Sequence, residues 1–163
     1  MSPLPESGAW PLDSSVRLAH IGLIVRRIDA AVMVYQRLGL SETGREAFPQ
    51  EHIRIAFIPV EDARIELMET LEPAGPLHRF LAARGEGIHH LAFEVSDLDA
   101  ALARVRGAGG RLIDETPRQG AGGTRVAFVH PTSMHGALVE LVERRDGPNT
   151  PSIIHHNSGR TPA

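Results

Sequence analysis

Two histidines and two glutamates recur at matching positions of the chain, and together they could hold a metal ion. His20 and His90 each stand in a short segment of alternating apolar residues, and Glu66 and Glu140 stand in two others. In each segment the polar residue falls on the face opposite the apolar one, because successive side chains of a strand point to opposite faces. Two imidazoles and two carboxylates suit a divalent transition-metal ion and leave room for water or substrate oxygens.

Each of these residues alone has a plainer interpretation. A single histidine on a strand is more often a hydrogen-bonded structural residue, and a single glutamate is more often solvated. Their matched placement in two parts of the chain favours a joint site for His20, Glu66, His90 and Glu140. His89 points away from His90, so we expect it in the core or beside the site rather than bound to the metal.

The recurrence extends to a repeat of the surrounding sequence. The segment HIGLIVRRIDAA, which begins at His20, aligns without a gap with HLAFEVSDLDAA, which begins at His90. Downstream, RIAFI matches RVAFV, and IEL matches VEL, which aligns Glu66 with Glu140. A repeat of this kind determines the architecture, because each copy is one supersecondary unit. We therefore predict an α+β fold in which two tandem βαβββ modules form a curved mixed sheet around a metal-binding cup.

Hydrophobic periodicity predicts the elements of each module. The first module is expected to hold strands at 16–25, 41–46, 52–60 and 63–70, with a helix at 28–38. The second is expected to hold strands at 88–95, 111–115, 124–130 and 137–143, with a helix at 98–108. Ser96 or Asp97 can cap that second helix. A short helix at 77–83 connects the modules, and 117–123 is expected to be a loop.

The apolar faces of the strands are expected to pack against the helices, which leaves the polar faces to line the cup. For the strand at 52–60 this expectation places Ile53, Ile55 and Phe57 on the helix side. For the helix at 28–38 it buries Leu38 together with Ile28.

Length and composition fit one compact domain, since the chain has 163 residues of which 42% are hydrophobic. We assign 16–145 to a single domain, with modules at about 16–72 and 85–145. The proline-rich segment 1–15 is expected to be a flexible arm, and 146–163 a disordered tail.

Several classes of partner are disfavoured. A net charge of −3 provides no basic surface for nucleic acid. The absence of cysteine excludes disulfides and thiol chemistry. We find neither a signal-peptide pattern nor an apolar run long enough for a membrane helix, so we expect a cytoplasmic protein with no membrane association.

The motifs resemble those of the vicinal oxygen chelate (glyoxalase/bleomycin resistance/dioxygenase) superfamily, and within it those of the methylmalonyl-CoA epimerases. The more specific stretches are GEGIHHLAFEV, which begins at Gly85, and VAFVHP, which begins at Val126. The resemblance spans about residues 17–143. It implies a divalent ion held by His20, Glu66, His90 and Glu140, with Co²⁺ the first candidate and Ni²⁺, Mn²⁺, Zn²⁺ and Fe²⁺ as alternatives. It also implies an acyl-CoA substrate and a homodimer.

The implied reaction interconverts (R)- and (S)-methylmalonyl-CoA by removal and return of the α-proton. A metal that chelates the thioester carbonyl and the carboxylate would act as a Lewis acid and stabilise the enolate. The resemblance makes Glu140 the first candidate for the base.

Two residues depart from the family pattern. Arg54 stands where some epimerases carry a glutamate that is taken as the second acid/base, and arginine stays protonated. Arg54 could pair with the substrate carboxylate or a CoA phosphate, or lie at the rim, and Glu51 is a nearby carboxylate. Thr132 stands where lysine often follows the His-Pro pair, so CoA contacts are not assigned there.

Three other functions share parts of this pattern. A glyoxalase I-type lactoylglutathione lyase can use the same four ligand types, but an Asp-Pro-Asp-Gly-like turn would be expected at 130–133. An iron dioxygenase needs two histidines, one carboxylate and open positions, one of which Glu66 would fill. A non-catalytic small-molecule-binding member of the superfamily would not need all four ligands.

Overall fold

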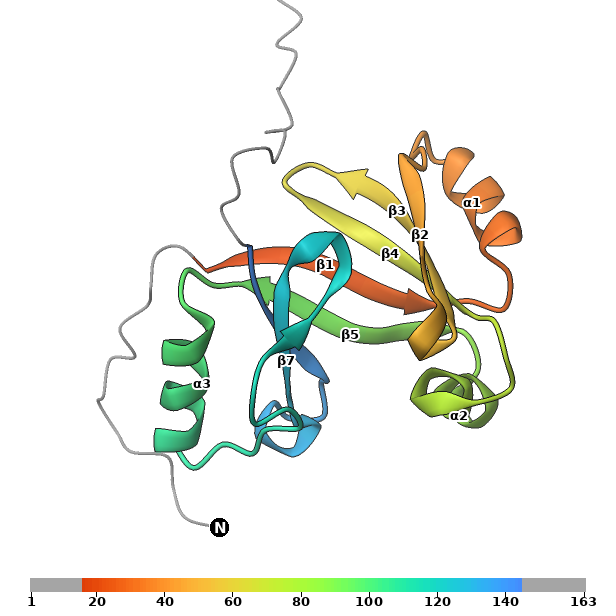
Figure 1. Cartoon of the computed structure of the whole chain (residues 1–163). Coiled ribbons are helices and arrows are strands. Elements are labelled where there is room, and N and C mark those ends of the chain that lie inside the picture. The colour runs from red at the N-terminus through yellow and green to blue at the C-terminus, as the bar shows by residue number, and fades with distance from the viewer. Residues whose placement is uncertain (1–15, 145–163) are drawn as a thin grey trace, which may run out of the picture.

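The computed structural model describes residues 16–144, and the expected arm 1–15 and tail 146–163 lie outside the described residues. Eight strands form one mixed sheet in the order β2-β3-β4-β1-β5-β8-β7-β6. The sheet curls into a half-barrel, with α1 at one end and α3 at the other (Figure 1). The predicted α+β fold of two similar modules is thereby confirmed.

The first module contains four strands and one helix. Its elements in chain order are β1 (Arg17–Ile24), α1 (Ile28–Gln36), β2 (Gly44–Phe48), β3 (Ile53–Val60) and β4 (Ala63–Thr70). A single 3₁₀ turn, η1 (Pro49–Glu51), joins β2 to β3. Strand β1 pairs in parallel with β4, and β2, β3 and β4 are antiparallel neighbours.

The second module repeats this plan after the linking helix α2 (Gly75–Arg84). Its elements are β5 (Gly87–Glu94), α3 (Leu98–Gly107), β6 (Arg118–Gln119), β7 (Arg125–Val129) and β8 (Val139–Glu143). Strand β5 pairs in parallel with β8, as β1 does with β4.

The modules meet where β1 runs antiparallel to β5, side by side across the middle of the sheet (Figure 1). In this pairing Gly22 lies opposite His90, and His20 lies opposite Ala92. The two histidines of the repeat therefore lie on neighbouring strands at the join between the modules.

One helix covers the outer face of each module. Ile28 and Val32 of α1 pack with Ala56, Ile58 and Leu67 in one buried cluster. A second buried cluster joins α3 to β7 and β8 and contains Leu98, Leu102, Ala127, Val129 and Leu141.

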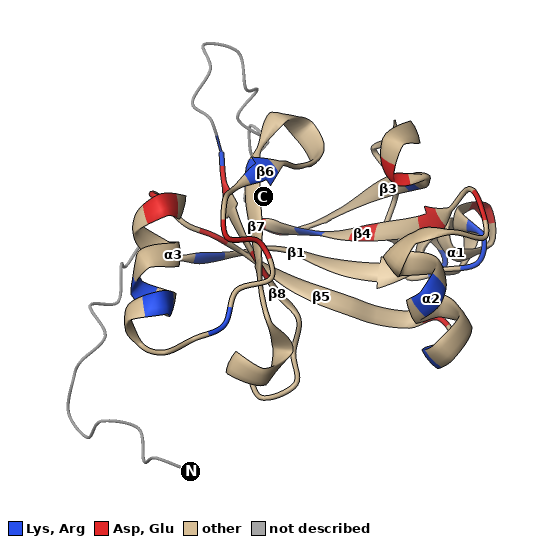
Figure 2. Ribbon diagram, turned by 60° about the horizontal axis from the view of Figure 1, so that its bottom comes forward, with Lys and Arg blue, Asp and Glu red and all other residues tan. Residues whose placement is uncertain are grey.

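Helix α3 is capped at its first turn, where the side chain of Asp97 accepts a hydrogen bond from the backbone N–H of Ala100 at 2.8 Å. It carries acidic residues at its start and arginines at its end (Figure 2), which complements the helix dipole.

The strand expected at 111–115 does not form. Its residues form an isolated bridge between Leu112 and Val129, with a few backbone hydrogen bonds beside it such as that from Ile113 to Phe128. The Asp114 carboxylate accepts the backbone N–H of Phe128, so a side chain takes the place of a strand partner there. The short strand β6 lies instead within the segment expected to be a loop.

Two packing expectations were also wrong. Helix α1 ends at Gln36, so Leu38 lies beyond it and its side chain is exposed. Strand β3 is apolar on both faces, and Ala56 and Ile58 are the residues that face α1. Ile53, Ile55 and Phe57 lie on the other face, where Ile53 and Ile55 cluster with Met68.

Within residues 16–144 we find no helix that is both long and apolar enough to cross a membrane.

Candidate metal centre

The four recurring polar residues all lie inside the half-barrel. His20 comes from β1, Glu66 from β4, His90 from β5 and Glu140 from β8, so four adjacent strands each contribute one residue. Their exposed fractions are 5%, 3%, 5% and 7%, and they are the buried polar residues of the described chain. Burial of four ionisable side chains is costly unless they are paired or bind a cation.

Three of the four bring their ligand atoms to one point. His20 Nε2 lies 2.9 Å from Oε2 of Glu140, and His90 Nε2 lies 3.2 Å from the same oxygen. The two Nε2 atoms are 3.0 Å apart. Neighbouring ligands around an ion at about 2.1 Å are separated by about 3 Å, so this spacing fits a small divalent cation.

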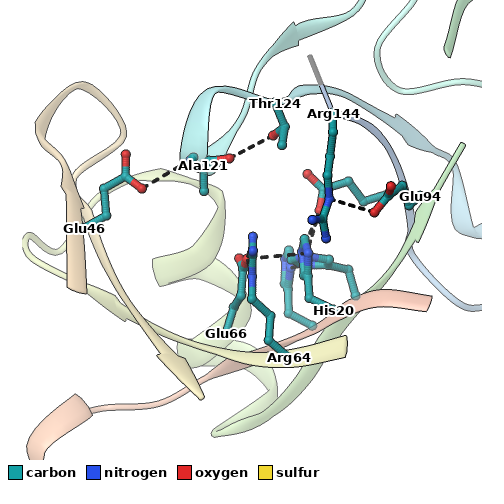
Figure 3. Close-up of polar contacts among 12 residues, drawn as sticks. His20, Glu46, Arg64, Glu66, Glu94, Ala121, Thr124 and Arg144 are labelled. Atoms are coloured by element: carbon teal, nitrogen blue, oxygen red, sulfur yellow. Dashed lines mark hydrogen bonds and ion pairs between the residues drawn. The ribbon is translucent and has the colours of Figure 1, made fainter. Parts of the chain in front are cut away.

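The fourth residue, Glu66, is turned partly away. Its Oε1 atom lies 3.5 Å from His20 Nδ1 and also accepts a hydrogen bond from Arg64 Nε at 2.7 Å, in an ion pair that brings Arg64 Nη2 to 2.6 Å. Figure 3 shows Arg64 and Glu66 side by side next to His20. The group of atoms close enough to share one ion consists of His20, His90 and Glu140.

The environment keeps Glu140 ionised. Burial alone would raise its pKa, but hydrogen bonds with His20 and His90 and their nearby charge outweigh burial and lower the pKa to about 2. The residue therefore presents a carboxylate, the form that binds a metal or accepts a proton.

The ring of the neighbouring residue, His89, contacts the ring of His90. The Nδ1 atoms of the two rings are 2.9 Å apart, and the His89 ring packs edge-on against Phe80 of α2. Burial lowers the pKa of His89 to about 4, so it is neutral near pH 7. If the shared proton is assigned to His90 Nδ1, the Nε2 atom of His90 keeps its lone pair for a metal.

A cavity of about 630 Å³ opens above these residues. Its walls are largely apolar and include Phe48, Ile53, Ile55, Leu77 and Phe128. The Phe128 ring stands edge-on to His90, with centroids 5.4 Å apart. Such a mixture of apolar walls and a few convergent polar groups is typical of small-molecule sites.

Residues 19–128 match the sequence profile of the Glyoxalase/Bleomycin resistance protein/Dioxygenase superfamily. The chain belongs to this superfamily. It is 38% identical over 128 residues to an uncharacterized protein of Bacillus subtilis (strain 168), which covers 78% of this chain and 91% of that protein. It is 35% identical over 128 residues to the ethylmalonyl-CoA/methylmalonyl-CoA epimerase of Cereibacter sphaeroides, covering 77% and 96% of the two chains.

A solved structure shows the same fold. A variant of Streptomyces coelicolor methylmalonyl-CoA epimerase in complex with 2-nitronate-propionyl-CoA superposes with a TM-score of 0.74 at 33% identity. The match covers 80% of this chain and 95% of that one.

In this member of the superfamily Arg54 is not part of the cup. It faces the helix side of the sheet and pairs with Glu69 at 3.1 Å, and Glu69 in turn accepts the backbone N–H of Ile28 at the start of α1. Arg54 is not among the residues that line the cavity. Its pair with Glu69 instead stabilises the beginning of the helix.

Glu51 lies at the mouth of the cavity. Its carboxylate pairs with Arg118 of β6 at 3.4 Å, and Arg118 also approaches Asp114 at 3.5 Å. A second contact links the two modules nearby, from the backbone N–H of Gly122 to Glu46 (Figure 3). The two outer edges of the sheet thus meet above the cavity.

The residue that sequence reasoning missed is Arg64. The period of two that places Glu66 and Met68 on the cup face also places Arg64 there, so the pattern contained the necessary information. The repeat gives no signal for it, because the matching position of the second module is the apolar Leu138.

Proposed function

We propose that this protein is a metal-dependent epimerase that interconverts (R)- and (S)-methylmalonyl-CoA. The observation that carries the proposal is the convergence of His20, His90 and Glu140 at the base of a largely apolar cavity. Relatives that are named methylmalonyl-CoA epimerases and that match this chain over most of their own length support the choice of substrate.

His20, His90 and Glu140 would hold the ion, and Glu66 would complete the set with whichever oxygen Arg64 leaves available. Nitrogen and carboxylate ligands of this kind suit Co²⁺, Ni²⁺, Mn²⁺, Zn²⁺ or Fe²⁺. When bound, a divalent ion supplies Lewis-acid chemistry, since it draws electron density from oxygens next to the reacting carbon.

Residues of the chain itself would accept the α-proton and shield the reacting group from water. Glu140 is ionised, and its carboxylate is the proposed acceptor of the α-proton. The neutral His89 holds the ring of His90 in place while the proton moves. The apolar walls formed by Ile55 and Phe128 limit the access of water and so strengthen electrostatic interactions in the cavity.

The experiment that tests the proposal follows the α-proton directly. Purified protein is incubated with methylmalonyl-CoA in deuterated water, as purified, after chelator, and after chelator followed by added Co²⁺. We expect deuterium at the α-carbon with the untreated and the Co²⁺-restored protein, and loss of exchange with chelator.

A parallel assay with the glutathione adduct of methylglyoxal tests the lactoylglutathione lyase alternative. Turnover of that adduct, without deuterium exchange on methylmalonyl-CoA, would replace the proposal with a lyase function.

A homodimer remains part of the proposal. Sedimentation of the 17.7 kDa chain at micromolar concentration tests it, and a single monomeric species would contradict it.

A further inference from the structure

Arg64 occupies a position inside the cup that the proposed reaction has not used. It lies on β4, two residues before Glu66 and on the same face, and lines the cavity with its side chain about one-third exposed. Its guanidinium carbon stands 5.1 Å from the centre of the Phe57 ring. Phe57 and Glu66 are direct partners in the β3–β4 pairing, so the ring and the carboxylate hold Arg64 from two sides.

Among the described residues, two arginines line the cavity, and Arg64 is the one beside the candidate metal ligands. The other arginine in its lining, Arg118, stands at the mouth and approaches both Glu51 and Asp114. Arg64 contacts one oxygen of one carboxylate through Nε and Nη2, and Nη1 is not part of that pair. A guanidinium has five N–H donors in a planar fork, so it can bind a second carboxylate.

The charges of the inner cavity point to an anionic ligand. Glu66 and Glu140 contribute two negative charges, which a divalent ion on the candidate ligands would balance. The positive charge of Arg64 is then left over in a cavity whose walls are largely apolar. A single carboxylate on the ligand would neutralise it.

We propose that Arg64 binds the carboxylate of the acyl group, through the oxygen that a chelating metal would leave open, and so makes the cup select acyl-CoA thioesters that carry a carboxylate on the α-carbon. This inference rests on the proposed function, because it assigns the acyl recognition of the same site. The contacts with Glu66 and Phe57 orient the guanidinium before the ligand arrives, which lowers the entropic cost of binding.

The test combines a change in the protein with a change in the ligand. Binding of methylmalonyl-CoA and of propionyl-CoA, which lacks the carboxylate, is measured by calorimetry on metal-loaded protein. The variants are R64Q, R64K and the control R106Q, which removes a positive charge from a surface pair with Glu115, neither of which lines the cavity. Metal content is measured for each sample.

We expect R64Q to weaken the binding of methylmalonyl-CoA about 10- to 100-fold. The affinity for propionyl-CoA should change less than about twofold. R64K keeps the charge but loses the planar fork, so its effect on methylmalonyl-CoA should be intermediate. R106Q should match the unaltered protein with both ligands, and metal content should be retained throughout.

Equal weakening of both ligands by R64Q, or a loss of metal, would overturn the inference and leave Arg64 as a support for Glu66. If R64Q does not fold, the same comparison with R64K decides, because a selective loss of methylmalonyl-CoA binding is expected there too. The two proposals can fail separately. If R64Q selectively loses methylmalonyl-CoA binding but the unaltered protein catalyses no deuterium exchange, the proposed reaction is refuted while the role of Arg64 stands.

Discussion

Gly22 lies directly opposite His90 across the β1–β5 pair, and the His90 ring covers the space where a side chain of residue 22 would be. A Cβ atom built on Gly22 would fall 2.2 Å from Cε1 of His90 and 2.5 Å from its Nδ1. The absence of a side chain at this position therefore lets the ring lie across β1 and reach His20.

Replacing Gly22 with alanine should displace the His90 ring and weaken metal binding by at least about tenfold, since ligands must keep their geometry to share an ion. Gly44→Ala is the matched control, because a Cβ at Gly44 meets no atom within 4 Å. Titration of Co²⁺ into chelator-treated protein measures both. Unchanged affinity in Gly22→Ala would mean that the ring moves aside without cost.

Metal analysis of the purified protein should find about one divalent ion per chain, and His90→Ala should lose it. The reason is that the Nε2 atom of His90 contacts both of the other converging atoms, His20 Nε2 at 3.0 Å and Glu140 Oε2 at 3.2 Å. His78→Ala, on helix α2 and outside the cavity lining, serves as the control and should retain the ion. Full occupancy in His90→Ala would remove the argument for a shared site.

The two glutamates should differ in their effect on turnover. Glu66→Gln should keep the metal and appreciable deuterium exchange, because an amide oxygen can still ligate. Glu140→Gln, measured at saturating metal, should lose about 10²- to 10⁴-fold in exchange, the usual contribution of a general base. The reverse pattern, with Glu66→Gln inactive and Glu140→Gln active, would move the base to the other side of the cup.

His89→Phe keeps the ring but removes the nitrogen that contacts His90 Nδ1. We expect metal affinity to fall by about 10- to 100-fold, as for other residues that orient a ligating histidine. Phe80→Leu changes the packing of the same ring and leaves the nitrogen in place, so its metal affinity should stay near that of the unaltered protein. Equal losses in both variants would assign His89 to packing alone.

Glu140 should make the metal-free protein sensitive to acid. Its pKa is lowered from 4.5 to about 2 in the folded state, so the unfolded chain binds this proton first as the pH falls. The stabilisation is complete above about pH 4.5 and is lost as the pH approaches about 2. In urea unfolding, the free energy of unfolding of the unaltered protein should exceed that of Glu140→Gln by an amount that shrinks across this pH range. A difference that stays constant would contradict the lowered pKa of Glu140.

Much of the fold was predictable because the repeat carries period-two strands at matching positions of the two modules. Strand β4 begins and ends where the alternation predicts, at Ala63 and Thr70, and the histidines and glutamates of the repeat share one face. Alternation could not orient β3, since both of its faces are apolar: Ile55 lines the cup and Ile58 packs under α1.

Other features depend on contacts that sequence patterns do not contain. The segment at 111–115 has strand-like residues, yet the Asp114 carboxylate takes the N–H of Phe128 that a strand partner would need. The ion pair between Arg64 and Glu66 is set by side-chain rotamers, and only the structure shows that it competes with His20 for the same oxygen.

The join between β1 and β5 has a consequence for how the two halves unfold. His20 and His90 are 70 positions apart in the chain, and each comes from a different module. An ion bound by both would hold the two modules together, so it would stabilise the fully folded protein but no state in which only one half is folded. Thermal melting would then become more cooperative and would shift upward with free ion concentration, because ligation of the native state draws the equilibrium by mass action.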